Sequence, residues 1–471
     1  MKTGLNILVF VASLLVALLG GWKTLRLYQA RYAFRLAENL YYDSDRNPPP
    51  RCRERLETSI RRASGDPEPH YLLGRIAARE RCFEDAVDHL QNAVGINPFD
   101  GRALYYLGLA FAEQGEREKA SEAMVQAAET AQNNAALQFR VGYYFWSWWT
   151  REGRVLILEK AFSFFHDAAK GDLSLLKRIL KTIEAYAFHY PNLVKVIPDT
   201  PEAHFLAARY LGRNRGLWKP ALEEFEKAGS ALEDRHDFLY ERGLARLMRD
   251  EDPRDDLRRA LRMAPDLATR RKRIREMSSF YRFADRIEEG LDFWRELEKA
   301  FPRNPAPAVN YAENALELAK QSMAGPMAEI EAERRKALQE AGGPKAKEEV
   351  NEFFTRKARA AWGKALADVE AYLMQQLVEF RDEALLWVFT ARTLALQQRF
   401  DEAELHFRHA AEIGNHVSYW IEFVKFLLRR GKSEEAWKTA IRVKVLFPDD
   451  PKADAMAKLA RKNLARAGEN R

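Results

Sequence analysis

The amino-acid sequence predicts an all-α protein: a helix–turn–helix solenoid with an N-terminal transmembrane helix and an inserted long helical hairpin. Helix-forming Ala, Leu, Glu, Arg and Lys are abundant, and Gly and Pro fall mainly between blocks of helical periodicity. Runs of alternating Val, Ile and Thr are nearly absent, which argues against strands. A spacing of about 34 residues recurs along the chain, and a fixed period of this length is typical of stacked helix pairs. The 471 residues suffice for two or three domains or for one extended array.

The first element is an apolar segment, "GLNILVFVASLLVALLGGW", which runs from Gly4 to Trp22 without a charge. Its 19 residues are long enough to span a bilayer core as a helix, and Trp22 stands where an interfacial aromatic residue is expected. A cleavable signal peptide is the alternative, but it needs small residues at the cleavage site, which Leu18–Gly21 match poorly. We expect an uncleaved transmembrane anchor at residues 1–22.

The charges give weak information about partners and orientation. The net charge of +7 is small for this length, so it favours acidic partners or anionic membrane surfaces only weakly and does not indicate nucleic acid. Lys2 precedes the apolar segment, whereas Lys23, Arg26, Arg31 and Arg35 follow it. Because cytoplasmic flanks carry the excess of Lys and Arg, this count favours a cytoplasmic body.

Two consecutive stretches of one period each, Pro67–Asp100 and Gly101–Asn134, align without a gap. Small aligned residues let the two helices of a pair approach closely, larger apolar residues fill the space between repeats, and Pro98 ends the second helix. One such pair cannot bury its apolar face alone, so pairs must stack. The aligned residues are Leu73–Gly74 with Leu107–Gly108, Ala86 with Ala120, Leu90 with Met124, and Ala93 with Ala127.

At these positions the chain resembles the tetratricopeptide repeat (TPR) family, and the resemblance covers most of residues 28–451. A looser similarity is to membrane-anchored TPR proteins of bacterial envelopes. The match is most specific at Leu73, Gly74, Ala86, Ala93 and Pro98. Further units match at Ala161, Phe165 and Ala168, at Ala221, Phe225 and Ala228, at Gly290, Trp294 and Pro302, at Ala403, Phe407 and Ala410, and at Trp420, Gly431, Ala436 and Pro448.

Other segments depart from this period. Because Leu56 lies one full period before Leu90, residues 51–63 are expected to form the second helix of a leading half-repeat. The charged stretch 305–380 is expected to form an antiparallel hairpin that turns at Gly342–Pro344, with a solvated insertion without a binding role as the alternative. The basic C-terminal segment is expected to cover the last apolar face, or else to lie on a membrane. The expected order is a transmembrane anchor (1–22), linking helices and the half-repeat (23–66), two TPR units (67–134), a degenerate aromatic-rich region (135–201), further TPR-like units (202–304), the hairpin (305–380), C-terminal TPR units (381–451) and a basic capping helix (452–471).

The stretch "GYYFWSWWTREG", Gly142–Gly153, concentrates aromatic residues where the first helix of a third repeat is expected. It is too short to span a bilayer. Since an inner solenoid helix is contacted on both sides, we interpret it as a packed core helix in which Phe145 and Trp149 are buried. The alternatives are that some of the rings line a partner groove or contact a membrane interface. Trp148 is expected to be exposed.

The TPR resemblance implies a concave groove lined by the first helix of each repeat. Such a groove would hold an extended peptide or a helix of a protein partner, and here it would be basic with aromatic patches. One TPR subclass clamps a C-terminal carboxylate with fixed Lys and Asn residues, but this chain has Tyr71 and Arg75 at the first two of those positions, so that activity is not carried over. The implied partner-binding residues are Tyr71, Arg75, Arg79, Tyr105, Trp148, Arg392, Lys425 and Arg429.

No motif for catalysis or for a cofactor is present, since the sequence contains no GxxxxGK[ST], GxGxxG or GxSxG pattern. We therefore expect neither enzyme activity nor a cofactor. Glu402, His406 and His409 lie on one stripe of a helix and could bind zinc. The two histidines flank the inward positions Phe407 and Ala410, so they are expected to face solvent, and no metal is expected. The basic run at residues 270–275 is interpreted as a solvated helix face.

The two cysteines, Cys52 and Cys82, are expected at the same edge of the array. A disulfide between them is geometrically conceivable and would require an oxidising compartment. Together with the similarity to envelope TPR proteins, this favours a single-pass inner-membrane protein with a periplasmic body. The flanking charges leave a cytoplasmic body open.

The sequence thus predicts a membrane-anchored TPR scaffold that recruits a protein partner in the assembly of an envelope or membrane complex, such as one for polysaccharide export. Its mechanism would be non-covalent, and the anchor would raise the local concentration of the scaffold near the membrane. The alternative is a glycan-binding module that uses the aromatic patches of the solenoid.

Overall fold

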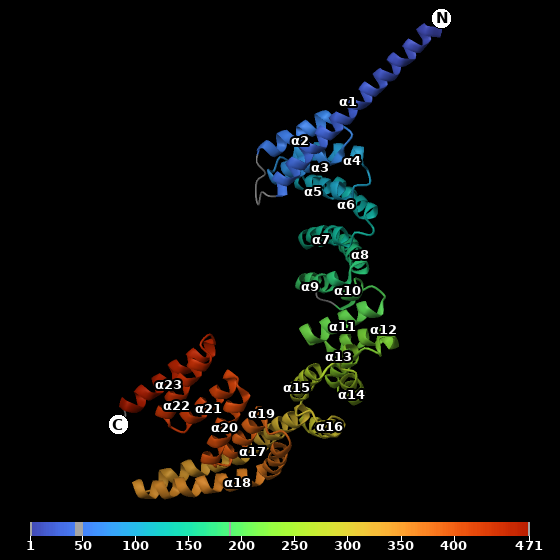
Figure 1. Cartoon of the computed structure of the whole chain (residues 1–471). Coiled ribbons are helices and arrows are strands. Elements are labelled where there is room, and N and C mark those ends of the chain that lie inside the picture. Colours follow the sequence, from blue (N-terminus) through green and yellow to red (C-terminus); the bar gives the residue numbers. More distant parts are fainter. Residues whose placement is uncertain (1, 43–49, 188–189, 470–471) are drawn as a thin grey trace. The chain divides into compact units, whose positions relative to one another are not determined.

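The computed structural model describes residues 2–42, 50–187 and 190–469, and within these ranges the side chains of residues 2–19, 187, 468 and 469 lie outside the description. Every regular element in the described ranges is a helix, which confirms the all-α prediction (Figure 1). The chain divides into two compact units, Met1–Ala231 and Leu232–Arg471. The boundary falls inside the segment 202–304, where the repeat pattern alone shows no break.

Unit 1 is built from successive helix pairs joined by short turns. Its helices are α1 (Lys2–Tyr42), α2 (Pro50–Arg62), α3 (Pro67–Arg79), α4 (Phe83–Ile96), α5 (Gly101–Glu113), α6 (Arg117–Thr130), α7 (Ala135–Glu152), α8 (Val155–Gly171), the short η1 (Leu173–Leu175), α9 (Leu176–Ala187), α10 (Tyr190–Val194), α11 (Pro201–Arg215) and α12 (Trp218–Ala228).

The pairs α3–α4 and α5–α6 show why the sequence period produces this fold. Asp66 and Asp100, one period apart, are the N-caps of α3 and α5, and each side chain accepts a hydrogen bond from a backbone N–H of the first turn. A Cβ atom on Gly74 would lie 2.5 Å from Leu90 Cγ, and one on Gly108 would lie 3.0 Å from Met124 Cγ. Glycine is therefore what lets the two helices of each pair approach this closely.

Helix α1 runs without a break from the apolar segment into the repeat array, and it extends beyond the rest of unit 1 (Figure 1). Its C-terminal part packs on α2 through Ala30, Ala33, Ala37 and Tyr41, each at most 3% exposed. The Ser59 hydroxyl donates to the Ala30 carbonyl at 3.0 Å across this contact. The predicted half-repeat is therefore a complete helix pair, because α1 supplies the missing first helix.

No helix in the described part of the chain has the length and apolarity of a membrane span. The predicted anchor, residues 1–22, is helical in its backbone from Lys2 onward as part of α1, and it contains the apolar segment 4–22. Most of its side chains, those of residues 4–19, lie outside the described residues.

Residues 135–201, the predicted degenerate aromatic-rich region, form two longer helices followed by a short irregular pair. Helices α7 and α8 have 18 and 17 residues, whereas α3 to α6 have 13 or 14. After them η1, α9 and α10 lead to Thr200, whose side chain accepts a hydrogen bond from Ala203 N as the N-cap of α11. Added helix length and the η1 turn explain why the regular spacing is lost here.

Unit 2 continues the helix-pair pattern around a long hairpin. Its helices are α13 (His236–Leu247), α14 (Arg254–Arg262), α15 (Leu267–Phe283), α16 (Ile287–Ala300), α17 (Ala306–Glu340), α18 (Pro344–Glu379), α19 (Ala384–Leu396), α20 (Phe400–Gly414), α21 (Val417–Arg429), α22 (Ser433–Leu446) and α23 (Pro451–Glu469).

Residues 305–380, for which the sequence predicts a hairpin, form α17 and α18, and these helices lie side by side (Figure 1). The base of the hairpin belongs to the core of unit 2, where Asn310 and Leu316 are buried and the Asn310 amide donates to the Ile274 carbonyl. Towards the tip the two helices are joined by polar contacts, such as that between Arg334 and Asn351 at 2.9 Å. The insertion is thus fixed at one end and solvated at the other.

Helix α23 covers the end of the array. Ala453, Met456, Ala457 and Ala460 are buried in the same core as Trp420 and Val443 of α21 and α22. Its basic side chains, such as Arg461 and Lys462, are exposed. This arrangement is the capping role that a terminal helix with one apolar face can fill.

Candidate partner-binding site

Tyrosine and arginine side chains from α1, α3 and α5 form one continuous cluster in unit 1. We call it the tyrosine–arginine surface, and it consists of Tyr41, Tyr71, Arg75, Arg79, Tyr105 and Tyr106, together with Arg140 of α7, which lies next to Tyr105. The Arg75 guanidinium lies 5.0 Å from the ring centroid of Tyr41, 5.4 Å from that of Tyr71 and 4.7 Å from that of Tyr106. Its Nη1 also donates to the Tyr71 hydroxyl at 3.2 Å. The arginine is thereby held in place by three rings.

Ring–ring contacts extend the surface from one repeat to the next. Tyr71 meets Tyr106 edge-on with centroids 5.8 Å apart, and Tyr105 meets Tyr106 at 5.4 Å. The Arg79 guanidinium lies 4.5 Å from the Tyr41 centroid. These contacts are possible because the first helices of successive repeats, α3 and α5, touch each other.

The phenol groups of Tyr41, Tyr71 and Tyr105 stay neutral at physiological pH, because their pKa values are raised above the usual value. Burial raises the pKa of Tyr71 to about 12, although the nearby Arg75 opposes the rise. Burial also raises the pKa values of Tyr41 and Tyr105. Arg140 of α7 lies close enough to Tyr105 to counteract part of that effect. These three tyrosines therefore supply no negative charge to balance the arginines.

In the described part of unit 1, no carboxylate forms an ion pair with Arg75, Arg79 or Arg140. Arg102, on the same helix as Tyr105, differs: it contacts Glu68 at 2.5 Å and Asp100 at 3.1 Å. Guanidinium groups bind carboxylates well, often with two parallel hydrogen bonds. The tyrosine–arginine surface is therefore an uncompensated cationic site among neutral rings.

The structure brings four of the predicted groove residues together. Tyr71 is buried, Arg75 and Tyr105 are half-buried, and Arg79 is exposed. Tyr41, Tyr106 and Arg140 were missed from the sequence. Tyr41 lies one period before Arg75, so the repeat spacing carried a signal for it, but the break after α1 concealed the first helix of that pair.

The aromatic residues of α7 pack differently from the prediction in two places. Phe145 is fully buried, as expected, but Trp149 is only half-buried, and Trp148 is half-buried rather than exposed. Trp146 takes the second buried position at 2% exposure, because the buried stripe of α7 continues from Val141 through Phe145 to Trp146. Trp148 stacks on Phe145 and meets Tyr144 at a tilt, with centroids 6.2 Å apart in both contacts, so it belongs to the ring cluster of α7.

The groove residues predicted in unit 2 do not form a comparable cationic site. Arg392 contacts Glu422 at 2.8 Å, and Lys425 lies 3.8 Å from the same carboxylate. Arg429 is exposed at the C-terminal end of α21. Glu422 neutralises much of the charge that the sequence assigned to this groove, and it could not be paired with Arg392 from spacing alone.

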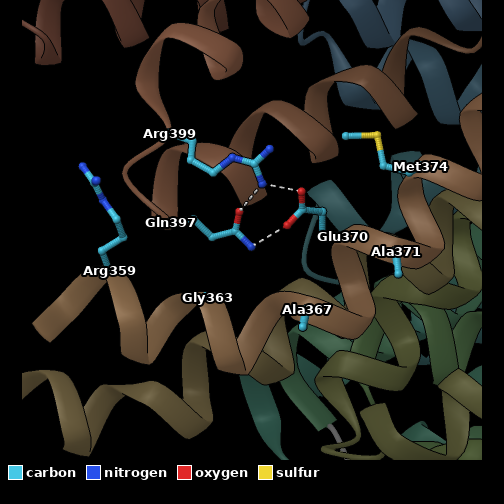
Figure 2. A pocket seen from close by; sticks show the side chains of 8 residues that line it. All are labelled: Arg359, Gly363, Ala367, Glu370, Ala371, Met374, Gln397 and Arg399. Atoms are coloured by element: carbon cyan, nitrogen blue, oxygen red, sulfur yellow. Dashed lines mark hydrogen bonds and ion pairs between the residues drawn. The ribbon is translucent and has the colours of Figure 1, made fainter. Parts of the chain in front are cut away.

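A pocket of about 460 Å³ lies beside α18 in unit 2. Its floor is made of small residues of α18, Gly363, Ala367 and Ala371. Figure 2 shows Glu370 held by Gln397 and Arg399 on one wall and Arg359 standing apart from them on the other. The Gln397 amide donates to Glu370 at 2.8 Å. This site is shallow and its acidic group is already satisfied, so it ranks below the tyrosine–arginine surface.

The zinc candidates of α20 have other partners. Glu402 contacts Arg399 at 2.6 Å, and His406 and His409 pack against the Trp387 ring with centroids 5.1 and 4.2 Å away. In the described residues no group of three or more His, Cys, Asp or Glu side chains is arranged to hold a metal ion.

The disulfide that the sequence leaves conceivable between Cys52 and Cys82 is not formed in this structure, in which both are free thiols. Cys52 is buried on the face of α2 that meets α1, and its Sγ donates to the Ala37 carbonyl at 3.2 Å. Cys82 is exposed at the N-cap of α4. The spacing placed both at one edge, but the face of α2 that carries Cys52 is covered by α1, which the sequence did not place there.

A buried polar network joins α10, α11 and α12 at the end of unit 1. His204 Nδ1 lies 2.6 Å from Glu224 Oε2, and its Nε2 lies 3.3 Å from Asp199 Oδ1. Tyr190 and Lys227 donate to the other Glu224 oxygen at 2.6 and 2.5 Å. Burial raises the pKa of Glu224, but the hydrogen bonds from Lys227, Tyr190 and His204 outweigh it and leave the pKa below its usual value. Both carboxylate oxygens of Glu224 and both ring nitrogens of His204 have a partner within the network, which makes it a structural clamp between three helices.

No family model matches the chain, and no curated protein matches it. Among solved structures, the chain is similar to YrrB, a TPR protein with an unusual peptide-binding site, at 15% identity over 46% of this chain and 95% of that one, with a TM-score of 0.23. It is similar to yeast Tom70 at 12% identity over 93% and 96%, with a TM-score of 0.29. The TPR domain of P58(IPK) matches at 14% identity over 85% and 99%, with a TM-score of 0.22.

Superpositions this loose carry no information on a partner. The helix pairs themselves, with their regular sequence period and their glycine contacts at Gly74 and Gly108, define the architecture. The chain is an all-helical solenoid of TPR-like repeats.

Proposed function

We propose that this protein is a membrane-anchored scaffold whose tyrosine–arginine surface binds an acidic segment of a protein partner. The observation that carries the proposal is the set of three arginines, Arg75, Arg79 and Arg140, that no carboxylate of the described residues neutralises. An acidic peptide or helix would supply the carboxylates, and the half-buried rings of Tyr105 and Tyr106 would add apolar contact area. Binding of this kind is non-covalent and requires no catalysis.

The proposed anchor is the apolar segment 4–22 at the start of α1. It would keep the tyrosine–arginine surface close to the membrane and so raise its effective concentration towards membrane-bound partners. By similarity to envelope TPR proteins, the proposed process is the assembly of an envelope or membrane complex, such as one for polysaccharide export.

The side of the membrane is a separate proposal, for which Cys82 is a built-in probe. We favour a periplasmic body, with a cytoplasmic body as the alternative. Cys82 is exposed and Cys52 is fully buried, so a thiol reagent that does not cross the inner membrane should label only Cys82. Labelling in intact inner-membrane vesicles of known orientation, with Cys82→Ser as the unlabelled control, decides between the two faces.

The binding proposal is tested by neutralising the arginines in the full chain. A protein partner is first recovered from detergent-solubilised membranes. The double variant Arg75→Gln, Arg140→Gln should lower the affinity for this partner at least tenfold, because each lost charge-assisted hydrogen bond is worth about 1.5–3 kcal/mol. Arg461→Gln with Lys462→Gln removes the same net charge from α23 and should leave recovery unchanged. Both proteins must melt like the unmodified chain.

Two outcomes would contradict the proposal. Equal recovery with both double variants would show that the tyrosine–arginine surface does not hold the partner. Carbohydrate that co-purifies without any stoichiometric protein would favour the glycan-binding alternative, which would draw on exposed rings such as Tyr143, 52% exposed.

A further inference from the structure

The part of α1 that follows the apolar segment exposes a band of large apolar side chains. Trp22 is 63% exposed, Tyr28 69% and Tyr32 57%. Leu25 and Leu27 are each 48% exposed in the same band. An isolated exposed ring on a soluble surface is ordinary, but five such side chains within three turns of one helix need an explanation.

The same band is strongly basic. Lys23, Arg26, Arg31 and Arg35 lie within it, and the sequence has no acidic residue before Glu38. Among the described residues no carboxylate pairs with these four, and the one contact of Arg26 is a hydrogen bond to the Arg61 carbonyl at 3.3 Å. We call residues 22–35 the basic collar.

The helix geometry places the basic collar next to the end of the apolar segment. Helix α1 is continuous from Lys2 to Tyr42, so no turn separates the collar from residues 4–21. At a rise of about 1.5 Å per residue, Arg26 lies about 6 Å and Arg31 about 14 Å beyond Trp22 along the axis. Arginine and lysine side chains reach back along a helix to keep their charges at the membrane surface. The first three cations of the collar can therefore reach the headgroup layer.

We propose that the basic collar binds anionic phospholipid headgroups at the membrane surface. The inference rests on the anchoring part of the proposed function, and it adds a lipid class as a second partner. Phosphate groups complement the unpaired cations, and tyrosine and tryptophan rings prefer the interface between headgroups and acyl chains. Within the described ranges, the face of this part of α1 that other helices cover is that of Ala30 and Ala33. The remaining faces are free to meet lipid.

The experiment uses the full chain reconstituted in lipid nanodiscs that contain a trace of a dansyl-labelled lipid, either phosphatidylglycerol or phosphatidylcholine. Energy transfer from Trp22 to the dansyl group reports which lipid lies beside the collar, and a Trp22→Phe variant gives the background from the other tryptophans. The expected result is severalfold stronger transfer to the anionic lipid, since each basic residue near the surface contributes about a fivefold preference.

Charge-neutral variants test the cause of that preference. Lys23→Gln, Arg26→Gln and Arg31→Gln together should bring the transfer ratio close to one. Lys462→Gln, Arg461→Gln and Arg466→Gln on α23 remove the same numbers of Lys and Arg and should leave the ratio unchanged. The proposal is overturned if the collar variant keeps the preference, or if the α23 variant loses it equally.

Failure of the collar and failure of the anchor give different readouts. A chain that stays in the discs through a high-salt wash but shows equal transfer from both lipids is anchored without lipid selectivity, which overturns the collar alone. A chain that leaves the discs in high salt and shows transfer from neither lipid overturns the anchor and the collar together.

Discussion

Gly74 sits where α3 meets α4 so closely that a methyl group there would lie 2.5 Å from Leu90 Cγ. Gly363 sits in the middle of α18 with no atom within 4 Å of the corresponding position. In a helix interior alanine is favoured over glycine by about 1 kcal/mol, and this gain applies to both positions. Only Gly74 also has a close contact that a methyl group would disturb, so the two substitutions should change the free energy of unfolding in opposite directions. Gly74→Ala is expected to lower the free energy of unfolding by about 1–3 kcal/mol, and Gly363→Ala to raise it slightly. Urea denaturation of both variants measures the difference, and a loss of stability at Gly363 would contradict it.

Glu224 makes the stability of unit 1 depend on pH. Because its pKa in the folded protein lies below the usual 4.5, its contribution is complete above that pH and is lost as the pH falls through the folded pKa. Glu224→Gln should destabilise the protein at neutral pH by about 3 kcal/mol, since it leaves Lys227 and His204 with a weaker acceptor.

Unfolding free energies measured from neutral pH downward test this expectation. The gap between the unmodified protein and Glu224→Gln should narrow below pH 4.5. Glu226 is exposed on the same helix, so Glu226→Gln should track the unmodified protein throughout. If the difference in unfolding free energy between the unmodified protein and Glu224→Gln stayed constant over the whole pH range, ionisation of Glu224 in the buried network would not be its cause.

At the scale of an element, α7 shows that one helix can present rings to a core on one side and to solvent on the other. Phe145 is fully buried against α8, where its ring stacks on Phe164 with centroids 5.6 Å apart, whereas Tyr143 two positions earlier is 52% exposed. Phe145→Ala should cost about 3–5 kcal/mol, the usual loss for a buried large aromatic. Tyr143→Ala should change stability by no more than about 0.5 kcal/mol. Chemical denaturation of the pair checks the assignment, and similar losses at both positions would refute it.

At the scale of the whole molecule, the two compact units are expected to respond separately to local damage. Ala86 lies in the core of unit 1 and Ala403 in that of unit 2, and both are fully buried. Ala86→Trp and Ala403→Trp each overpack one core, at a cost of about 1–3 kcal/mol or more. In a repeat array stability is a sum of local terms, so each variant should shift a different part of the calorimetric melting curve. Identical shifts of a single transition would mean that the units unfold together.

The helix pairs could be predicted from the sequence because their determinants are local. Gly74 and Ala86 recur one period later as Gly108 and Ala120, and each acts through its own small size. The candidate site was predicted in part for the same reason, since Tyr71, Arg75 and Arg79 occupy positions set by that spacing. What could not be predicted depends on contacts between helices. The pairing of Arg392 with Glu422 and the burial of Cys52 under α1 are examples, because both follow from which faces meet in space.

The unbroken course of α1 has a consequence for the direction in which the scaffold faces. Gly20 and Gly21 lie inside the helix, so the segment proposed to cross the membrane and the first helix of the array share one axis and one rotational phase. Each residue of an α-helix advances the chain by about 1.5 Å and turns it by about 100°. Inserting a single alanine after Trp22 would therefore swing the tyrosine–arginine surface through more than a quarter turn about the axis of α1 and lift it only slightly. The number of residues between the membrane and the array therefore sets the direction in which the surface faces about the axis of α1. Two inserted residues would turn the surface to nearly the opposite side, and about seven would return it to its original direction.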